Sequence, residues 1–362
     1  MIRRASTRTP AARWLIVGHF GGANLGDEAM LAGVLHYARA HGVSCAVSVS
    51  DPVRAAGVHG PGVEWAPEGL LAVARAVVRG SGIAFCGGTH LHDEFRGRRL
   101  AYHWLSLARY AVYLGLARAL GRRAVLLGHG VGQLTHVVTR GLARFMLWAC
   151  DSVTVRDAAS REALDALSTK REIVTGFDLA GLLPVGPAHD STADRIAIAP
   201  RLTAEFDLRF WMRACAAAAA ACPGGNVLLL PFQLSWPADD VETVRQLSAA
   251  CRAATGQEFD IVDLHARPAA YAEVLSRCAV VVGARYHAVL LAALHSAPVV
   301  IVPYESKLRS LARELAIPDD CIVSAGSSVE ELTAAIGRAR ATELPPRDPD
   351  AMLRTAAPLL DA

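Results

Sequence analysis

An arginine and a histidine stand two residues apart in the stretch "GARYHAVLLAALHSAP", residues 283–298. Apolar runs at 279–282 and 299–302 flank it, which is typical of a β-α-β unit with buried strands. Inside a regular helix, Arg285 and His287 would point in different directions. They can face one target if Arg285 lies in the turn and His287 in the first helical turn. Because backbone N–H groups and the helix dipole favour negative charge there, the spacing predicts a site for an anion.

Two further cations follow predicted strands. Lys307 comes directly after the strand that succeeds this helix, and Arg156 closes the strand predicted at 152–155. A lone lysine is most often a solvated surface charge, and Asp157 beside Arg156 reads equally well as a surface pair or a helix cap. A guanidinium at the carboxyl end of a strand is nevertheless suited to bidentate capture of carboxylate or phosphate.

The glycine-rich stretch "GHFGGANLGDEAMLAGVL", 18–35, allows a tight turn from a strand into a helix. Its spacing is not G-x-G-x-x-G and no Gly-Lys-Ser/Thr follows, so it supports neither dinucleotide nor P-loop binding. Asp27 and Glu28 open the helix, as an N-cap and a first-turn acid favoured by the dipole. The same carboxylates would repel phosphate and suit a polyol, so the loop could instead hold sugar hydroxyls.

A second loop, "CGGTHLHDEF" at 86–95, combines Gly87 and Gly88 with His90, His92 and Asp93. The two glycines would let the backbone approach a ligand. H-x-H-D could ligate a metal, but no third ligand is fixed by the spacing. Hydrogen bonding to a substrate, or plain loop structure, is the preferred interpretation, and we expect no metal.

The elements that must position these residues alternate from end to end. The predicted strands are 13–18, 45–49, 83–86, 124–128, 152–155, 173–175, 195–199, 226–231, 259–263, 278–282, 299–303 and 320–323, with helical stretches between them. This pattern indicates an α/β protein with two doubly wound parallel-sheet, Rossmann-like domains. Ligands in such folds bind at the carboxyl ends of the strands, where the loops above lie.

The predicted domains are 1–185, an N-terminal Rossmann-like domain, and 186–345, a C-terminal one, joined at a stretch rich in Pro, Gly and small polar residues. Residues 346–362 are expected to form a last helix that could pack back on the N-terminal domain.

The composition narrows the function classes. Hydrophobic residues make up 52% of the 362 and charged residues 20%, which indicates a folded protein. The net charge is only +3, so the composition does not indicate a nucleic-acid-binding protein. Eight scattered cysteines without a C-x-x-C pair favour a reducing cytosol. The apolar stretch 101–120 carries Arg109 and Arg118 and reads as a buried or interfacial helix. We therefore expect a cytoplasmic protein, with peripheral contact at the inner face of a membrane left open.

These loops, in this order, resemble the polysaccharide pyruvyl transferase family. The matching pieces are "NLGDEAML" (24–31), "CGGTHLHD" (86–93), "GHGVGQL" (128–134), "VRDAAS" (155–160), "GFDLA" (176–180) and "GARYHAVLLAALHSAPVVIVPYESKL" (283–308). The family commonly has Leu where this chain has Tyr286. It also commonly has a third Gly where Cys86 stands, and lacks His90 and His92.

The resemblance implies a GT-B-like fold with two domains facing a cleft. It also implies transfer of the enolpyruvyl carbons of phosphoenolpyruvate onto a sugar as a ketal, in bacterial polysaccharide or cell-envelope biosynthesis. Phosphoenolpyruvate is then a co-substrate, no other cofactor is expected, and the acceptor is a sugar or lipid-linked saccharide. The implied donor site comprises Arg156, Arg285, Tyr286, His287 and Lys307. The implied acceptor side comprises Asn24, Asp27, Glu28, Gly87, Gly88, His90, His92 and Asp93.

His287 is the candidate for acid–base work, because the unperturbed pKa of histidine lies near neutral pH. We expect His287→Ala and Arg285→Ala each to abolish turnover and to leave the melting curve nearly intact. Two other functions fit the sequence. A nucleotide-sugar glycosyltransferase would also need a cationic site in the C-terminal domain, and a non-catalytic relative could bind glycans.

Overall fold

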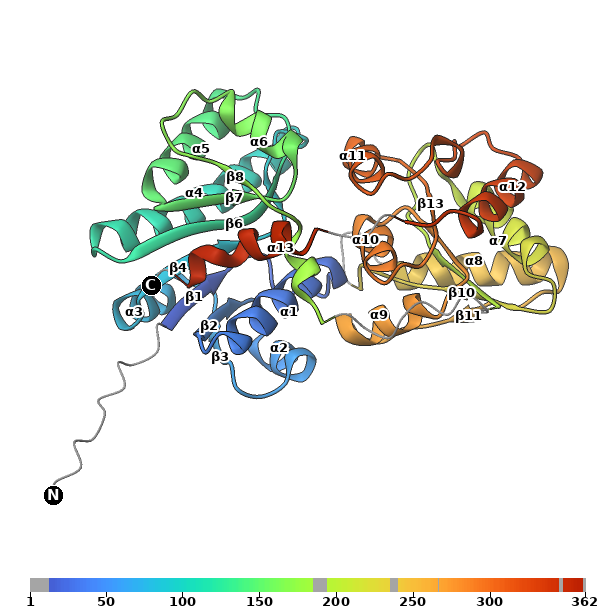
Figure 1. The fold of residues 1–362 in the computed structure, drawn as a ribbon, viewed down its shortest axis with the longest axis horizontal. Coiled ribbons are helices and arrows are strands. Elements are labelled where there is room, and N and C mark those ends of the chain that lie inside the picture. Colours follow the sequence, from blue (N-terminus) through green and yellow to red (C-terminus); the bar gives the residue numbers. More distant parts are fainter. Residues whose placement is uncertain (1–12, 185–193, 235–239, 266, 345–347, 361–362) are drawn as a thin grey trace, which may run out of the picture. The chain divides into compact units, whose positions relative to one another are not determined.

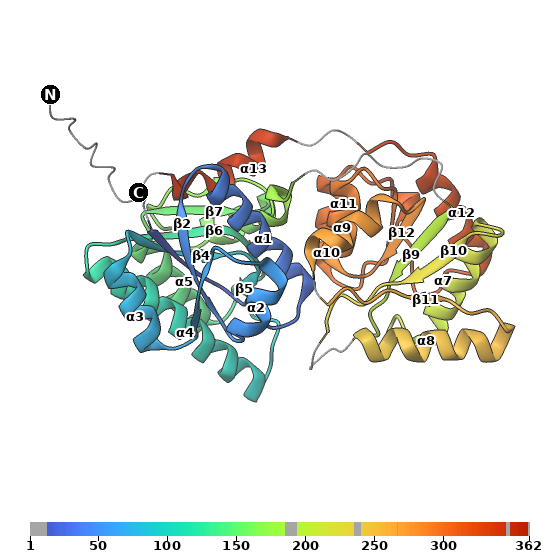
Figure 2. The same ribbon diagram turned by 90° about the horizontal axis from the view of Figure 1, so that it is seen from below.

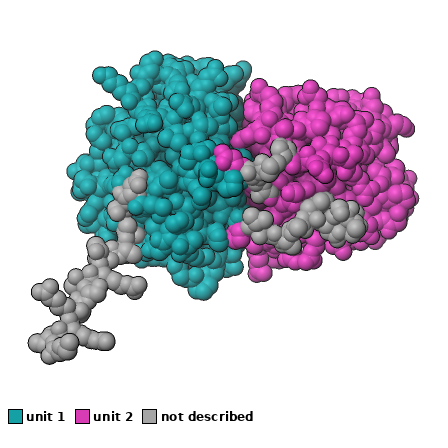
Figure 3. Space-filling view, viewed as in Figure 1, with its two compact units in different colours: residues 1–21, 30–183, 349–362 teal, residues 22–29, 184–348 magenta. Residues whose placement is uncertain are grey.

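The computed structural model describes residues 13–184, 194–234, 240–265, 267–344 and 348–360. The described residues fall into two compact units (Figure 3). The first contains those up to 21, from 30 to 183 and from 349 on, and the second contains 22–29 and 184–348. The predicted boundaries, 185/186 and 345/346, fall in segments outside the described residues. Residues 22–29, which the sequence places in the N-terminal domain, group with the second unit.

The first unit is built on a parallel sheet with the order β3-β2-β1-β4-β6-β7-β8, and β5 pairs with the end of β6. Its strands are β1 Arg13–Val17, β2 Ser44–Val49, β3 Glu64–Pro67, β4 Gly82–Cys86, β5 Thr89–Leu91, β6 Arg123–Val131, β7 Ser152–Val155 and β8 Val174–Thr175. Its helices are α1 Leu25–Ala40, whose first turn groups with the second unit, α2 Pro52–His59, α3 Leu70–Arg79, α4 Arg98–Ala119, α5 Val137–Ala149, α6 Ala158–Asp165, η1 Leu179–Leu182, α13 Pro349–Ala356 and η3 Ala357–Leu359. The strand order reverses between β1 and β4.

The second unit repeats this plan on a smaller scale (Figures 1 and 2), with the parallel order β11-β10-β9-β12-β13. Its strands are β9 Arg195–Ala199, β10 Asn226–Leu229, β11 Asp260–Ile261, β12 Val280–Gly283 and β13 Val299–Ile301. Its helices are α7 Leu208–Ala221, α8 Asp240–Thr255, α9 Pro268–Ser276, α10 Tyr286–Leu294, α11 Ser306–Glu314, η2 Asp319–Cys321 and α12 Val329–Arg340. The order reverses between β9 and β12, so the loops after these two strands flank the crevice where such sheets bind ligands.

Burial explains why the central strands were readable from the sequence. β4 and β12 are buried at every residue, and parallel strands covered on both faces need continuous apolar runs. In the first unit, residues such as Leu15, Phe85 and Leu126 pack with Leu107 and Leu114 of α4 in one core. The prediction of two parallel α/β sheets is confirmed.

The predicted strands differ from the observed ones in three places. The strands β3 and β5 were missed, because one reads Glu-Trp-Ala-Pro and the other Thr-His-Leu, which are short and lack an apolar run. The predicted strand at 320–323 is wrong. There, Pro318 precedes the 3-10 turn η2, and only Ile322 makes a single parallel bridge, to Ile301.

The C-terminal helix α13 packs on the first unit. The buried hydroxyl of Thr355 accepts from the backbone N of Phe177 at 2.7 Å, and the hydroxyl of Thr154 donates to the carbonyl of Thr355 at 3.0 Å. The indole of Trp14 in β1 donates to the carbonyl of Leu359 at 3.0 Å. These bonds fix α13 and η3 against the sheet of the first unit.

None of the helices in the described part of the chain is long and apolar enough to cross a membrane. All eight cysteines are free thiols, and seven of them are buried.

Candidate functional site

Arg285 and His287 lie where β12 turns into α10. Arg285 is the N-cap residue with an extended backbone, and α10 begins at Tyr286, which puts His287 in the first helical turn. The predicted placement of the two side chains, one in the turn and one in the helix, is therefore confirmed. Tyr286 is buried and its ring contacts that of His287, with centroids 5.1 Å apart.

The guanidinium of Arg285 is held by a carboxylate that the sequence analysis missed. Its Nε donates to Oδ2 of Asp240 at 2.8 Å, and Nη2 donates to Oδ1. The Asp240 side chain is 3% exposed and also accepts from the backbone N of Phe232 and of Gln233. Such a bidentate pair fixes the direction of the guanidinium and leaves its remaining N–H donors for a ligand.

This ion pair corrects one expectation. Arg285→Ala would leave the buried Asp240 carboxylate without its cation, which typically costs about 3–5 kcal/mol. The melting curve of that variant should therefore shift, and Arg285→Ala cannot separate a loss of catalysis from a loss of folding.

His287 packs against the first turn of α1. A Cβ placed on Gly26 would stand 2.1 Å from Nδ1 of His287, so the ring lies directly on the glycine backbone. The segment is held there by β-type pairing: Leu25 N donates to the carbonyl of Phe232, Leu234 N donates to that of Ala23, and Asn24 bridges to Gln233. The motif at 24–28 and the motif at 285–287, far apart in the sequence, thus lie together in the second unit.

Asn24 caps helix α1. Its Oδ1 accepts from the backbone N of Gly26 at 2.9 Å and of Asp27 at 3.4 Å. The interpretation of Asp27 as the N-cap is therefore wrong: Asp27 and Glu28 both lie in the first turn, and Glu28 is buried. They still add negative charge at the helix N-terminus, where the dipole favours it. Their role toward an acceptor stays a prediction.

Lys307 lies in the first turn of α11 and forms an ion pair with Glu305, the residue before that helix. Burial alone would raise the pKa of Glu305, but Lys307, hydrogen bonds and Arg201 together hold it below its usual range. Arg201, which the sequence analysis missed, follows β9 and stands 4.7 Å from the ring centroid of Tyr304. Its position just beyond a predicted strand was the signal that could have found it. No carboxylate of the described residues forms an ion pair with Arg201.

In the first unit, a cluster of rings occupies the carboxyl ends of the strands at the reversal of strand order. His90 lies against Phe85, Tyr110 and His129, with ring centroids 5.0, 5.6 and 5.6 Å from its own. Gly88 has φ +72°, and a Cβ there would stand 2.5 Å from Cε1 of His90. The glycine is therefore needed both for its backbone conformation and for the space that the imidazole fills.

The proton of His90 can be placed from its partner. Nδ1 lies 3.0 Å from the carbonyl of Gly87, which can only accept, so Nδ1 carries the hydrogen and Nε2 holds a lone pair when the ring is neutral. Burial, then the neighbouring His129 and His19, lower the pKa of His90 well below its usual value. At neutral pH, Nε2 is therefore a hydrogen-bond acceptor.

His129 is part of this cluster and is completely buried. Neither ring nitrogen has a hydrogen-bond partner among the described residues. The nearby carbonyl of Leu127 favours the protonated ring and so acts to raise the pKa of His129. Burial, with some repulsion from Arg156, lowers the pKa of His129 to about 3.

His92 and Asp93 make contacts within the first unit. The carboxylate of Asp93 accepts from the backbone N of Thr135 and of His136, each at 2.6 Å, and from the hydroxyl of Thr139, at the start of α5. Burial would raise the pKa of Asp93, but these donors lower it. His92 is buried, and its Nδ1 accepts from the backbone N of Glu94 at 3.2 Å. The structure thus gives Asp93 a structural role, that of holding the loop to α5.

Arg156 is buried in the first unit. Nε contacts Asp157 at 3.2 Å, Nη1 contacts Asp178 at 3.5 Å, and Nη2 donates to the hydroxyl of Thr89 at 3.2 Å. Asp157 also caps α6, as one of the two sequence interpretations had it. The guanidinium therefore joins β5, β7 and the turn before η1, and its proposed contact with a donor stays a prediction.

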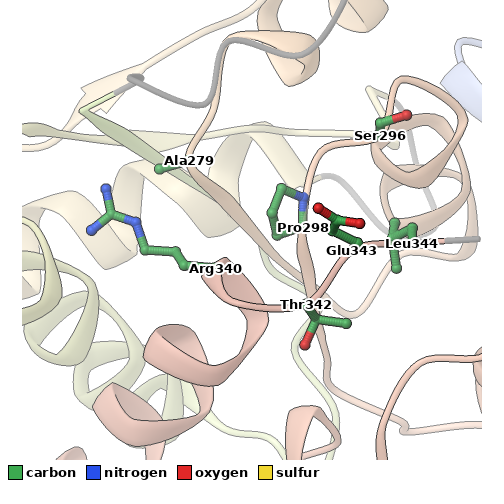
Figure 4. A pocket seen from close by; sticks show the side chains of 7 residues that line it. All are labelled: Ala279, Ser296, Pro298, Arg340, Thr342, Glu343 and Leu344. Carbon is green, nitrogen blue, oxygen red and sulfur yellow. The ribbon is translucent and has the colours of Figure 1, made fainter.

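A cavity of about 400 Å³ lies at the amino ends of strands β12 and β13 in the second sheet (Figure 4). Its lining includes Ala279 and Pro298, which immediately precede β12 and β13, together with Arg340 and Glu343. Because parallel α/β sheets bind ligands at the carboxyl ends of their strands, this cavity is not the candidate site. Within the described ranges, no three His, Cys, Asp or Glu side chains gather in a way that could hold a metal ion.

Comparison with known proteins gives a family and a fold. The model of the family described as "Polysaccharide pyruvyl transferase" matches residues 24–306. A search of curated proteins found no match.

Several solved structures resemble this chain over nearly its whole length. UDP-GlcNAc 2-epimerase from Methanocaldococcus jannaschii has a TM-score of 0.63 at 9% identity, covering 97% of this chain and 100% of that one. The putative UDP-N-acetylglucosamine 2-epimerase from Listeria monocytogenes has a TM-score of 0.59 at 11% identity, with 96% and 92% covered. Anabaena Alr3699/HepE in complex with UDP and glucose has a TM-score of 0.54 at 15% identity, with 96% and 93% covered. The GT-B-like fold class is confirmed.

Proposed function

The chain belongs to the polysaccharide pyruvyl transferase family, and from that premise we propose that it transfers the enolpyruvyl group of phosphoenolpyruvate to two hydroxyls of a sugar. The product is a pyruvate ketal on a glycan or lipid-linked saccharide, and inorganic phosphate is released. Membership of the family makes the protein a transferase.

One observation carries the assignment of the donor. Three neighbouring strands of the second sheet, β9, β12 and β13, each lead at the carboxyl end into a cationic side chain: Arg201, Arg285 and Lys307. Phosphoenolpyruvate carries both a carboxylate and a phosphate, and guanidinium groups bind both in fixed geometry. The ion pairs with Asp240 and Glu305 hold two of these cations in place before a ligand binds.

His287 supplies the proton chemistry in this proposal. One sugar hydroxyl adds to C2 of phosphoenolpyruvate, while the C2=C3 electron pair takes a proton from the imidazole and forms the methyl group. The bond between C2 and the phosphate oxygen then breaks, and phosphate leaves with that electron pair. The second hydroxyl attacks C2 and completes the ketal. The two hydroxyl protons end on C3 and on phosphate, so a group that both gives and takes a proton completes the cycle.

The acceptor is assigned to the first unit's ring cluster. The lone pair on Nε2 of the partly exposed His90 suits a hydrogen bond from a sugar hydroxyl, and the buried rings of Phe85 and Tyr110 pack against the imidazole and hold it in place. Gly87 and Gly88 both have positive φ, and a Cβ on them would clash with Sδ of Met30 and with the His90 ring, so the loop needs both glycines to hold this shape.

The test is mass spectrometry of candidate acceptors incubated with isotopically labelled phosphoenolpyruvate, together with phosphate release. We expect a ketal adduct and equimolar phosphate. His287→Asn should lose at least about a hundredfold in kcat/KM, since proton transfer contributes about 10²–10⁴. His265→Asn, at an 81% exposed side chain, is the matched control and should keep full activity. Wild-type turnover by His287→Asn would contradict the assigned role.

A nucleotide-sugar glycosyltransferase is the second candidate, because the resembling HepE structure was solved with UDP and glucose. The same cations would suit a diphosphate. Thermal melting with phosphoenolpyruvate and with a panel of UDP-sugars separates the two functions. Stabilisation by a UDP-sugar and none by phosphoenolpyruvate would decide against pyruvyl transfer.

A further inference from the structure

One face of the first unit is formed by a segment that is basic and free of acid. Between Glu94 and Asp151 the sequence has no Asp or Glu. Over the same stretch it has the arginines Arg96, Arg98, Arg99, Arg109, Arg118, Arg122, Arg123, Arg140 and Arg144. The whole chain, in contrast, balances 37 basic residues against 34 acidic ones. The segment contains α4, β6 and α5, so the asymmetry is concentrated on two neighbouring helices.

Helix α4 exposes apolar side chains on its outer face. Leu107 and Leu114 point into the core, whereas Leu105 is 67% exposed and Val112 is 51% exposed. Leu105 and Val112 are seven residues apart, two helical turns, so they lie on the same face. Tyr102, near the start of the helix, is 72% exposed. A surface helix usually presents polar residues at such positions.

Helix α5 extends this apolar surface. Phe145 and Trp148 are 41% and 56% exposed. A Cβ on Gly115 of α4 would stand 2.9 Å from Cζ of Phe145, and the guanidinium of Arg118 lies 4.5 Å from the ring centroid of Trp148. Phe145 and Trp148 of α5 therefore lie against Gly115 and Arg118 of α4, and the two helices run side by side in Figures 1 and 2.

The charges decide which partner this surface fits. Arg98 and Arg99 are exposed at the start of α4, and Arg118 is exposed at its end. A second copy packed symmetrically on this face would set arginines against arginines. An anionic lipid surface would pair with the arginines and accept the apolar side chains. Tyr and Trp, which bear a polar group on an apolar ring, are the residues enriched where a bilayer meets water.

We propose that the face formed by α4 and α5 docks the protein on a bilayer that contains anionic phospholipid. Arg98, Arg99 and Arg118 contact the headgroups, while Leu105, Val112 and Trp148 enter the boundary between headgroups and acyl chains. This proposal goes beyond pyruvyl transfer and holds or fails independently of it.

The experiment is vesicle flotation of the full chain, with phosphatidylcholine alone and with added phosphatidylglycerol. We expect binding to the anionic vesicles at low ionic strength and little to the neutral ones. Binding should weaken as salt rises, because the charges are screened. Binding that is equal on both vesicles, or unaffected by salt, would overturn the proposal.

Two pairs of variants test the surface itself. Arg98→Gln with Arg99→Gln should weaken partitioning to anionic vesicles about 25-fold, at about fivefold for each arginine near the membrane. Arg209→Gln with Arg245→Gln, exposed in the second unit, removes the same charge and should change partitioning little. Leu105→Ser with Val112→Ser should also weaken binding, whereas Val53→Ser with Leu353→Ser, at exposed positions on α2 and α13, should not.

The alternative outcomes are distinct. If both pairs of variants bind vesicles like the wild type, this face is not the docking surface. If light scattering shows a dimer that Leu105→Ser with Val112→Ser dissociates, the face is instead an interface between two copies of the chain. Transferase turnover on a soluble acceptor should remain unchanged in every variant.

Discussion

At Gly26, a methyl group would stand 2.1 Å from Nδ1 of His287, well inside van der Waals contact. The histidine therefore depends on the absence of a side chain in a segment more than two hundred and fifty residues earlier in the chain. Neither residue type reveals this dependence, since a glycine in the first turn of a helix reads only as a weak helix former.

Gly26→Ala tests whether the position of His287 matters to the reaction. The added methyl displaces the imidazole, and a shift of about 1 Å in a reacting group can cost about a hundredfold in rate. Gly337→Ala in α12, where no atom lies within 4 Å of the new methyl, is the control and should keep wild-type activity. Both are assayed as kcat/KM for phosphate release. Full activity of Gly26→Ala would mean that His287 has no part in turnover.

At the level of elements, a buried hydroxyl helps to join the C-terminal helix to the first unit. Thr355 of α13 accepts from the backbone N of Phe177 and donates to a nearby carbonyl. The helix also buries Met352 and Ala356 against the first unit, and polar contacts such as this one fix its position there.

Thr355→Val keeps the shape of the side chain but leaves the backbone N of Phe177 without its acceptor. The free energy of unfolding should fall by about 1–3 kcal/mol, the cost of a buried unsatisfied donor. Thr333→Val in α12 removes a hydroxyl that bonds only within its own helix, to Val329, and should cost less than about 1 kcal/mol. Urea unfolding measures both. Equal losses in the two variants would show that the contact of Thr355 with Phe177 does not anchor α13.

For the molecule as a whole, a buried histidine links stability to pH. The pKa of His129 falls from 6.5 to about 3 on folding, chiefly through burial. Between these values the unfolded chain binds a proton that the folded chain does not, so stability falls as the pH falls below about 6.5. The lowered pKa values of His90 and His103 act in the same direction.

From pH 6.5 to pH 5, His129 alone should cost the first unit about 2 kcal/mol, since each pH unit in that window costs about 1.4 kcal/mol. His129→Leu fills the same apolar surroundings without a titrating group and should remove this part of the slope. Hydrogen exchange of the β4 and β6 amides, measured over that pH range, reports it. If the variant keeps the wild-type slope, His129 is not the residue responsible.

The fold class and the local setting of the site could both be predicted from the pattern of residues along the chain. Continuous apolar runs such as Val280–Val282 specify strands buried on both faces, and the residues that follow them necessarily reach the carboxyl edge of the sheet. Arg285 in the turn and His287 in the first helical turn follow from that periodicity. Short or polar strands, such as β3 and β5, carry no such signal and were missed.

The partners of these side chains could not be predicted in the same way. Asp240 beside Arg285, Gly26 beneath His287, and Asp178 beside Arg156 are contacts between segments that are distant in the chain. The periodicity of the sequence indicates which face of a helix or strand is apolar, because that is a local property of the chain. The neutralisation of a charge by another depends on distances of a few ångströms, which are fixed only when the sheets and their loops pack.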